Sequence, residues 1–201
     1  MTFDKEIKMF QKLLMGTIVS VAFVFAQEPA ATYTYVGTKM CKMCHNKEET
    51  GKQFAIWEKS LHGNALATLK TEEAKRIAVT KGIKTAPDQT AECIQCHVTG
   101  FGDASGYQLN VDVADAKAVA KNEKMENVGC EMCHGPGSGY KTKKTMEAVS
   151  KGEIEPASVG LIAPTAATCE KCHNEKSPTH KKFVFEEAVK IIAHPNPAKK
   201  L

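Results

Sequence analysis

Cysteine spacing constrains this chain more than any other feature of its sequence. All eight cysteines belong to four copies of one pentapeptide, Cys-x-x-Cys-His, and none is left over. Cysteines three residues apart lie on one side of a helical turn, and the histidine after each second cysteine lies close to both. The cysteines are Cys41, Cys44, Cys93, Cys96, Cys130, Cys133, Cys169 and Cys172, and the histidines are His45, His97, His134 and His173.

This spacing is typical of covalent haem attachment. The two cysteines can form thioethers with the two vinyl groups of one haem while the histidine binds the iron. A disulfide scaffold and a set of zinc sites are the competing interpretations of paired cysteines. Neither explains why a histidine follows every pair. The sequence therefore predicts four covalently bound haem c groups.

Histidine number limits the coordination of the predicted irons. The chain has seven histidines, and the four in pentapeptides leave His62, His180 and His194 as candidate distal ligands. At most three haems can therefore have two histidine ligands, and one iron must be five-coordinate or bind another side chain such as methionine. The candidate methionines are Met40, Met43, Met125, Met132 and Met146.

The three remaining histidines differ in their expected setting. His62 lies at the edge of an apolar face in a helix expected over residues 48–69. His194 is expected at the end of a helix over residues 185–194, which can present its ring to a haem. His180 lies in an expected loop, where solvent exposure and iron ligation are both open.

The first 26 residues have the pattern of a secretory signal. Three lysines precede an apolar run from Leu13 to Phe25, and the small residue Ala26 follows it. The run is shorter than the roughly 20 residues that span a bilayer. We expect cleavage near Ala26, which leaves one tetrahaem domain over residues 27–201 in the periplasm or outside the cell.

Charge and composition narrow the possible partners. The formal net charge is +4, of which the first 26 residues carry +1, and this excess is too small for nucleic-acid binding. One Trp, four Tyr and eight Phe are few large side chains for a core of this size, unless porphyrins add apolar volume. Haem propionates would also add an acidic surface that can steer a basic redox partner. Membrane contact is expected only in passing.

Outside the pentapeptides the pattern predicts helices joined by loops, with little β structure. Asp112 is expected to cap one helix, because its side chain can accept hydrogen bonds from first-turn N–H groups. One short strand is expected at residues 107–111, after a glycine-rich turn. The expected helices cover residues 48–69, 71–81, 112–125, 143–151 and 185–194, and the expected irregular segments cover residues 27–38, 81–89, 99–107 and 152–168.

Further residues resemble the tetrahaem cytochrome c-554 family of multihaem c-type cytochromes. The resemblance covers most of residues 37–140, and the C-terminal part resembles the family more loosely through the fourth pentapeptide and the segment from Phe185 to His194. The matching residues outside the pentapeptides are Trp57, Ser60 and His62, then Val98-Thr99-Gly100-Phe101-Gly102 with Gly106-Tyr107, then Gly129 and Gly135-Pro136-Gly137.

This resemblance implies a mainly α fold, in which helices and loops wrap around four closely packed haems. It implies two histidine ligands at three haems and a five-coordinate iron at the haem of His97. It further implies that His62 serves the haem of a later pentapeptide, with the third favoured, and that His194 serves the fourth. The family also has a histidine shortly after Gly-Pro-Gly, where this chain has Tyr140 and several lysines, and His180 is the expected substitute at the first haem.

These features together predict an exported electron carrier whose donor and acceptor are other exported redox proteins. Two histidine ligands saturate an iron and leave no position for a substrate. A redox enzyme is one alternative, binding nitric oxide, nitrite or hydroxylamine at the haem of His97, although no acid–base cluster stands out over residues 98–110 beyond Asp103 and Tyr107. A homo-oligomer is the other, in which residues 27–36 and 194–201 join copies into a cytochrome filament.

Overall fold

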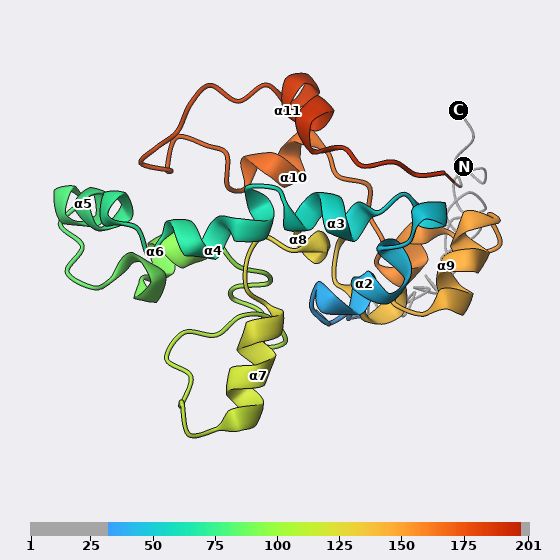
Figure 1. Cartoon of the computed structure of the whole chain (residues 1–201), viewed down its shortest axis with the longest axis horizontal. Helices are drawn as coiled ribbons and strands as arrows, with labels where there is room; N and C mark the ends of the chain where they lie inside the picture. Colours follow the sequence, from blue (N-terminus) through green and yellow to red (C-terminus); the bar gives the residue numbers. More distant parts are fainter. Residues whose placement is uncertain (1–31, 198–201) are drawn as a thin grey trace, which may run out of the picture. The chain divides into compact units, whose positions relative to one another are not determined.

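Short helices and irregular loops make up the part of the chain that the computed structural model describes, residues 32–197. Within that range the only β pairing is an isolated antiparallel bridge between Val98 and Glu126, so the predicted mainly α fold is confirmed. The α-helices in chain order (Figure 1) are α2 (Lys39–His45), α3 (Gln53–Glu58), α4 (Ala65–Thr68), α5 (Glu72–Thr80), α6 (Ala91–Ile94), α7 (Ala116–Lys124), α8 (Cys130–His134), α9 (Lys143–Ser150), α10 (Ala166–Glu170) and α11 (Phe185–Ile192). Shorter 3-10 turns are η1 (Glu48–Thr50), η2 (His62–Asn64), η3 (Pro87–Gln89), η4 (Gly137–Gly139) and η5 (Pro156–Val159).

The predicted signal peptide at residues 1–26 lies outside the described residues. From Thr32 onward the chain belongs to one unit. Helices long and apolar enough to cross a bilayer are absent between residues 32 and 197.

The continuous helix predicted over residues 48–69 is wrong. The structure divides this segment into η1, α3, η2 and α4. Gly51 and Lys52 have positive φ angles of 96° and 51°, which end the first turn. The Asn64 side chain then donates to the carbonyl oxygens of Glu58 and Ser60, so local side-chain hydrogen bonds compete with a continuous helix.

Three further expectations need correction. Residues 107–111 form no strand, and Asn110 has a positive φ of 58° that interrupts extended structure. Asp115 rather than Asp112 caps α7, because the Asp115 carboxylate accepts from the N–H groups of residues 117 and 118. The helix α11 ends at Ile192 instead of reaching His194. Pro195 disfavours helical backbone angles at His194, the residue before it.

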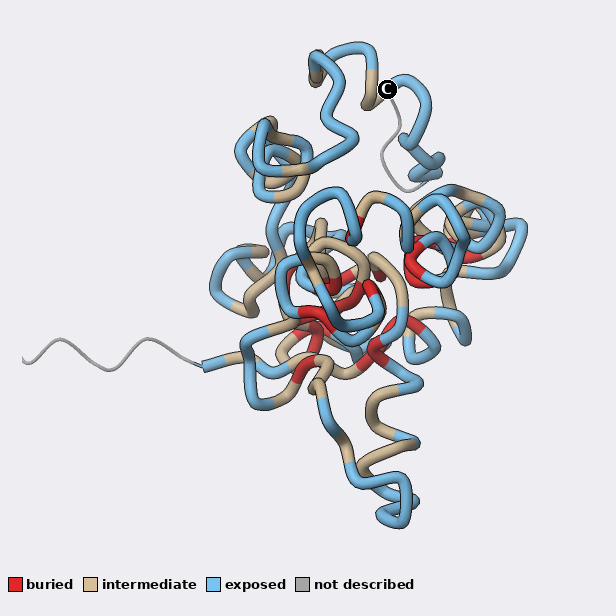
Figure 2. Tube along the Cα trace, turned by 90° about the vertical axis from the view of Figure 1, so that its left-hand side faces the viewer, coloured by how far each residue is buried: buried red, intermediate tan, exposed pale blue. Residues whose placement is uncertain are grey.

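The apolar core is small and surrounds the second pentapeptide. Leu66, Leu69, Ile94 and Val98 form its centre. Cys93, Phe101, Tyr107 and Leu109 pack against them. Figure 2 shows that buried residues gather in the middle of the molecule, whereas the chain near its C-terminus is exposed. The apolar side chains therefore hold together only part of the fold.

A buried carboxylate holds the N-terminal segment against the third pentapeptide. Glu131 is only 2% exposed. Its Oε1 accepts from the N–H groups of Val36 at 2.9 Å and Gly137 at 2.6 Å, and its Oε2 accepts from the N–H group of Gly37 at 2.7 Å. These bonds bridge 95 and 94 positions of sequence to the N-terminal segment, so one side chain fixes where α2 begins.

Replacing this carboxylate tests its role in stability. Glu131→Ala should lower the free energy of unfolding by about 3 kcal/mol, because two buried N–H groups and one partly buried N–H group lose their acceptor. Glu131→Gln keeps one acceptor oxygen and should lose less. Denaturant unfolding of the purified protein measures both, with Glu153→Ala as the exposed control, expected within about 0.5 kcal/mol of wild type. An unchanged midpoint for Glu131→Ala would mean that other contacts hold the N-terminal segment.

Candidate haem-binding sites

The four pentapeptides lie on short helices or on the turns that follow them. The first and third are contained in α2 and α8. The second and fourth begin on α6 and α10 and end in the turn directly after each helix. In all four, helical spacing brings the two cysteines to one side of the turn.

Cysteines of different pentapeptides lie side by side. A hydrogen bond to Cys130, together with burial, raises the pKa of the Cys41 thiol, and the same bond lowers the pKa of Cys130. Cys172 and Cys96 form a second such pair, in which the shared hydrogen bond raises the pKa of Cys172 and lowers that of Cys96 to about 7. The first pentapeptide is therefore a neighbour of the third, and the second is a neighbour of the fourth.

The two pairs meet through the third and fourth pentapeptides. Burial raises the pKa of Cys133, and the charge of nearby Cys169 adds to the shift. Cys133 in turn contributes to the raised pKa of Cys172. The spatial order of the pentapeptides is therefore first, third, fourth, second.

Two histidine pairs have the geometry of axial ligands. The ring centres of His62 and His173 are 5.9 Å apart, and those of His134 and His194 are also 5.9 Å apart. Two imidazoles on opposite sides of one metal place their ring centres about 6 Å apart, because each metal–nitrogen bond is about 2 Å long and each ring centre lies about 1 Å beyond its nitrogen. The ring spacing of both pairs is thus compatible with one shared iron.

This pairing differs from the one that the resemblance implied. His62 lies beside the histidine of the fourth pentapeptide rather than the third, and His194 lies beside that of the third rather than the fourth. Sequence order cannot reveal this exchange, because both distal histidines are far in sequence from both candidate partners. The position of each ring depends on how the loops cross.

In each pair, the more buried ring has a lowered pKa. Burial lowers the pKa of His62, and the charge of His173 lowers it further. Burial also lowers the pKa of His134, and His194 and His45 contribute in the same direction. A neutral imidazole has a free lone pair for iron, so these environments favour ligation.

Backbone carbonyls orient two of the pentapeptide histidines. The Nδ1 atom of His97 lies 2.7 Å from the Ala65 carbonyl oxygen, and that of His134 lies 3.3 Å from the Ile162 carbonyl oxygen. The Nδ1–H group of each ring donates to its carbonyl, which leaves Nε2 with the lone pair that can bind a metal. These carbonyls are contacts that no sequence motif reveals.

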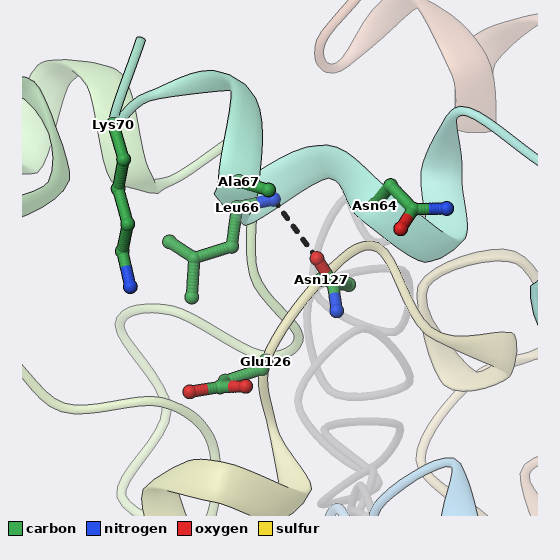
Figure 3. A pocket seen from close by; sticks show the side chains of 6 residues that line it. All are labelled: Asn64, Leu66, Ala67, Lys70, Glu126 and Asn127. Carbon is green, nitrogen blue, oxygen red and sulfur yellow. Dashed lines mark hydrogen bonds between the residues drawn. The ribbon is translucent and has the colours of Figure 1, made fainter.

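Asn127 fixes the helix that orients His97. Its Oδ1 accepts from the Leu66 N–H group at 2.9 Å (Figure 3), and its carbonyl oxygen accepts from the Thr99 hydroxyl. Its φ of 66° is positive, a conformation that asparagine tolerates better than most residues. Sequence reasoning missed this residue, because an asparagine two residues after a predicted helix has many possible roles.

Three histidines have no such ring partner within residues 32–197: His45, His97 and His180. His180 is exposed and lies in the loop between α10 and α11. Figure 1 shows this loop extending to the left, away from α2, which carries His45. The structure therefore does not bring His180 to the first pentapeptide.

The five candidate methionines differ in burial and in their contacts. Met125 is 2% exposed, and the Met132 sulfur accepts from the Gly100 N–H group at 3.2 Å. Met40 and Met43 are exposed, and Met146 is half-buried on α9. No contact among the described residues assigns any of these five side chains to an iron.

Tyr140 occupies the segment where the family has a histidine, and it is committed to other contacts. It is 8% exposed, and its hydroxyl donates to the Gly135 carbonyl oxygen at 2.5 Å. Burial raises its pKa, with the charge of Glu131 adding to the shift, so the phenol is neutral. A neutral phenol that already donates a hydrogen bond is a poor iron ligand.

The apolar surface beside the candidate ligands fits a porphyrin. Met43 lies within the first pentapeptide and is 69% exposed, Leu61 directly precedes His62 and is 87% exposed, and Ile191 lies three residues before His194 and is 88% exposed. Large apolar side chains next to metal-binding groups gain stability when a flat apolar group covers them. Together with the ring spacing, this makes the residues compatible with covalently attached haem.

Comparison with known proteins agrees with these features. A family model described as cytochrome c554 and c-prime matches residues 40–135. Cytochrome c-554 of Nitrosomonas europaea is 28% identical over 169 residues, which span 79% of this chain but only 66% of that protein's length, just under two thirds. The solved structure of reduced cytochrome c554 from the same organism has a TM-score of 0.53 and 26% identity, covering 80% of this chain and 79% of that one.

The pairing of His62 with His173 makes a spectroscopic prediction. His62→Ala should convert one haem from low-spin to high-spin without loss of covalent haem, because its iron loses a strong axial ligand. In a C169A/C172A background, which cannot hold the fourth haem, the same change should add no high-spin signal. Electron paramagnetic resonance of the oxidised proteins measures this.

A background without the third haem supplies the control. In C130A/C133A protein, His62→Ala should still add the high-spin signal. The reverse pattern, with a signal in the first background and none in the second, would show that His62 serves the third haem.

Proposed function

We propose that this chain is a member of the cytochrome c554 family, that it carries four covalently attached haem c groups, and that it transfers electrons between redox proteins; its similarity to cytochrome c-554 supports this. The eight pentapeptide cysteines would form the thioethers, and the four pentapeptide histidines would bind the irons. Each haem supplies one-electron redox chemistry when bound, and the chain sets its spacing, orientation and ligands.

The two histidine pairs are the observation that carries this proposal. With ring centres 5.9 Å apart, His62 with His173 and His134 with His194 can each saturate one iron. A saturated iron has no position for a substrate and exchanges single electrons with its neighbours. The paired haems belong to the third and fourth pentapeptides, which stand in the middle of the spatial order.

The order of the pentapeptides supports a continuous electron path. Because the sulfur pairs Cys41–Cys130 and Cys96–Cys172 lie on either side of the neighbouring Cys133 and Cys169, each haem would have a close neighbour. Electrons would enter at the first or second haem and leave at the other. One partner would then dock near α2 and the other near α6, and either of them could be the electron donor.

The resemblance implied two histidine ligands at three haems, but the first haem would lack its second histidine. His45 has no ring partner among the described residues, and the exposed His180 lies on a loop that leads away from α2. We therefore assign two saturated irons, those of His134 and His173. The irons of His45 and His97 would each have one histidine ligand from this chain.

A redox enzyme acting on nitric oxide, nitrite or hydroxylamine is the second candidate, because an iron with one histidine ligand can bind a small molecule. The surroundings of His97 supply few proton donors. Hydrogen bonds from Ser105 lower the pKa of the Asp103 carboxyl, so it is ionised at neutral pH. Burial raises the pKa of Tyr107, so its phenol holds its proton. This chemistry favours electron transfer over catalysis.

Export, partners and assembly follow from the same proposal. The pattern of residues 1–26 supports export to the periplasm, where other exported redox proteins would be donor and acceptor. A homo-oligomer or filament is the alternative arrangement. Sedimentation of the purified protein distinguishes a monomeric carrier from a filament, since a filament sediments as a large heterogeneous species.

Carbon monoxide binding tests the ligand assignment. In the dithionite-reduced protein about two of four haems should bind the gas, because only an iron with a vacant sixth position binds it readily. A difference spectrum scored against the pyridine haemochrome count measures the fraction. His180→Ala should leave this fraction unchanged.

A different fraction of haem binding carbon monoxide would show which ligand assignment is wrong. Binding at about one haem in four, rising to about two in His180→Ala protein, would make His180 a ligand of the first or second haem. Binding at none would show that other side chains fill both positions, and the enzymatic alternative would then be excluded.

A further inference from the structure

We propose that Gln53 and Gly51, at the turn between η1 and α3, are positioning residues that hold His194 against the iron of the third haem. This inference rests on the proposed function, in which His134 and His194 share that iron. Gln53 and Gly51 together form the clasp.

His194 is weakly held by its own helix. The helix α11 has no buried residue, and it ends at Ile192, two positions before His194. His194 itself is exposed, and Figure 2 shows the chain leading to the C-terminus as exposed. A ligand on such a segment needs another contact to keep its ring in place.

Gln53 supplies that contact. Its Nε2 donates to the Pro195 carbonyl oxygen at 2.9 Å and also to the Thr50 carbonyl oxygen. Its Oε1 is buried and has no hydrogen-bond partner among the described residues, whereas the bond from Nε2 to Pro195 lies at the surface. Between residues 32 and 197, no other hydrogen bond joins α11 or the segment after it to a part of the chain before Val184.

Gly51 allows the close approach of the same segment. A Cβ atom at this position would lie 2.9 Å from the Pro195 carbonyl oxygen and 3.1 Å from both Pro195 Cβ and Pro197 Cδ. Real Cβ atoms do not approach a carbonyl oxygen this closely, so only glycine fits here without a shift of the segment. Pro195, the residue after His194, is therefore held by a hydrogen bond from Gln53 and by close packing against Gly51.

The clasp affects how firmly His194 can bind the iron. Pro195 directly follows His194, so the contacts of Gln53 and Gly51 limit the movement of the His194 backbone, whose ring centre lies 5.9 Å from that of His134. When the clasp is weakened, the segment gains conformational freedom and the equilibrium shifts toward released His194. An external ligand that competes for the same iron then binds with higher apparent affinity.

The first test removes the hydrogen bond. Gln53→Ala should raise the apparent carbon monoxide affinity of the third haem about fivefold, the effect of one ordinary hydrogen bond on the ligation equilibrium. His194→Ala identifies the signal of that haem, because its iron then has no competitor. The matched control is Gln89→Ala, which makes the same change at an exposed site on η3 and should leave the titration unchanged.

The second test uses steric overlap. Gly51→Ala should displace Pro195 and raise the same affinity at least as much. Gly82→Ala is the matched control, because Gly82 has a comparable positive φ of 72° and nothing within 4 Å of an added Cβ. The control has the backbone strain without the collision, so it should leave the third haem unchanged.

A double variant separates positioning from general stability. In His194→Ala protein, adding Gln53→Ala should produce no further change in spin state or carbon monoxide affinity, because no ligand remains to be positioned. A further change there would overturn the inference. So would wild-type affinity in both Gln53→Ala and Gly51→Ala while His194→Ala opens the haem, and in that case the proposed function would stand.

Failure of the proposed function has a different signature. Fewer than four covalent haems in the wild-type pyridine haemochrome assay would contradict the tetrahaem proposal itself. An unchanged spin state in His194→Ala protein would contradict the ligand role of His194, and the clasp would fall with it.

Discussion

The pentapeptide helices are too short to be stable alone, and the rest of the structure compensates for this. They span four to seven residues, whereas isolated helices need about 12–15 residues to persist in water. Among residues 32–197, the core cluster includes residues of the second pentapeptide and of no other pentapeptide. The others depend on polar contacts from distant segments, above all the Glu131 carboxylate, and on whatever covers the exposed apolar side chains beside the histidines.

Features that depend on local sequence were predictable. The pentapeptides, the mainly α fold and the helices α5 and α9 follow from spacing, periodicity and capping within a few residues. The segment from residue 48 to 69 shows where this approach fails. Its apolar spacing is helical, yet Gly51 and the Asn64 side chain interrupt the helix, and competition between local hydrogen bonds cannot be read from periodicity.

Contacts that depend on the crossing of loops were not predictable. Sequence identified His62 and His194 as candidate ligands, but their partners are decided by which segments meet in space. The same holds for Asn127 and Glu131, whose side chains bind backbone groups 61 to 95 positions away. Glu131 even lies inside a pentapeptide, at a position that the haem motif leaves free, so its structural role has no signature of its own.

The spatial order of the pentapeptides has a consequence for assembly. The first two to be synthesised stand at the two ends, and the last two fill the middle. A partly completed chain therefore has two separated attachment sites with nothing between them. The row becomes continuous only when the third and fourth pentapeptides are both in place, so a chain cut between the second and third pentapeptides would keep the two end sites and lose every site that links them.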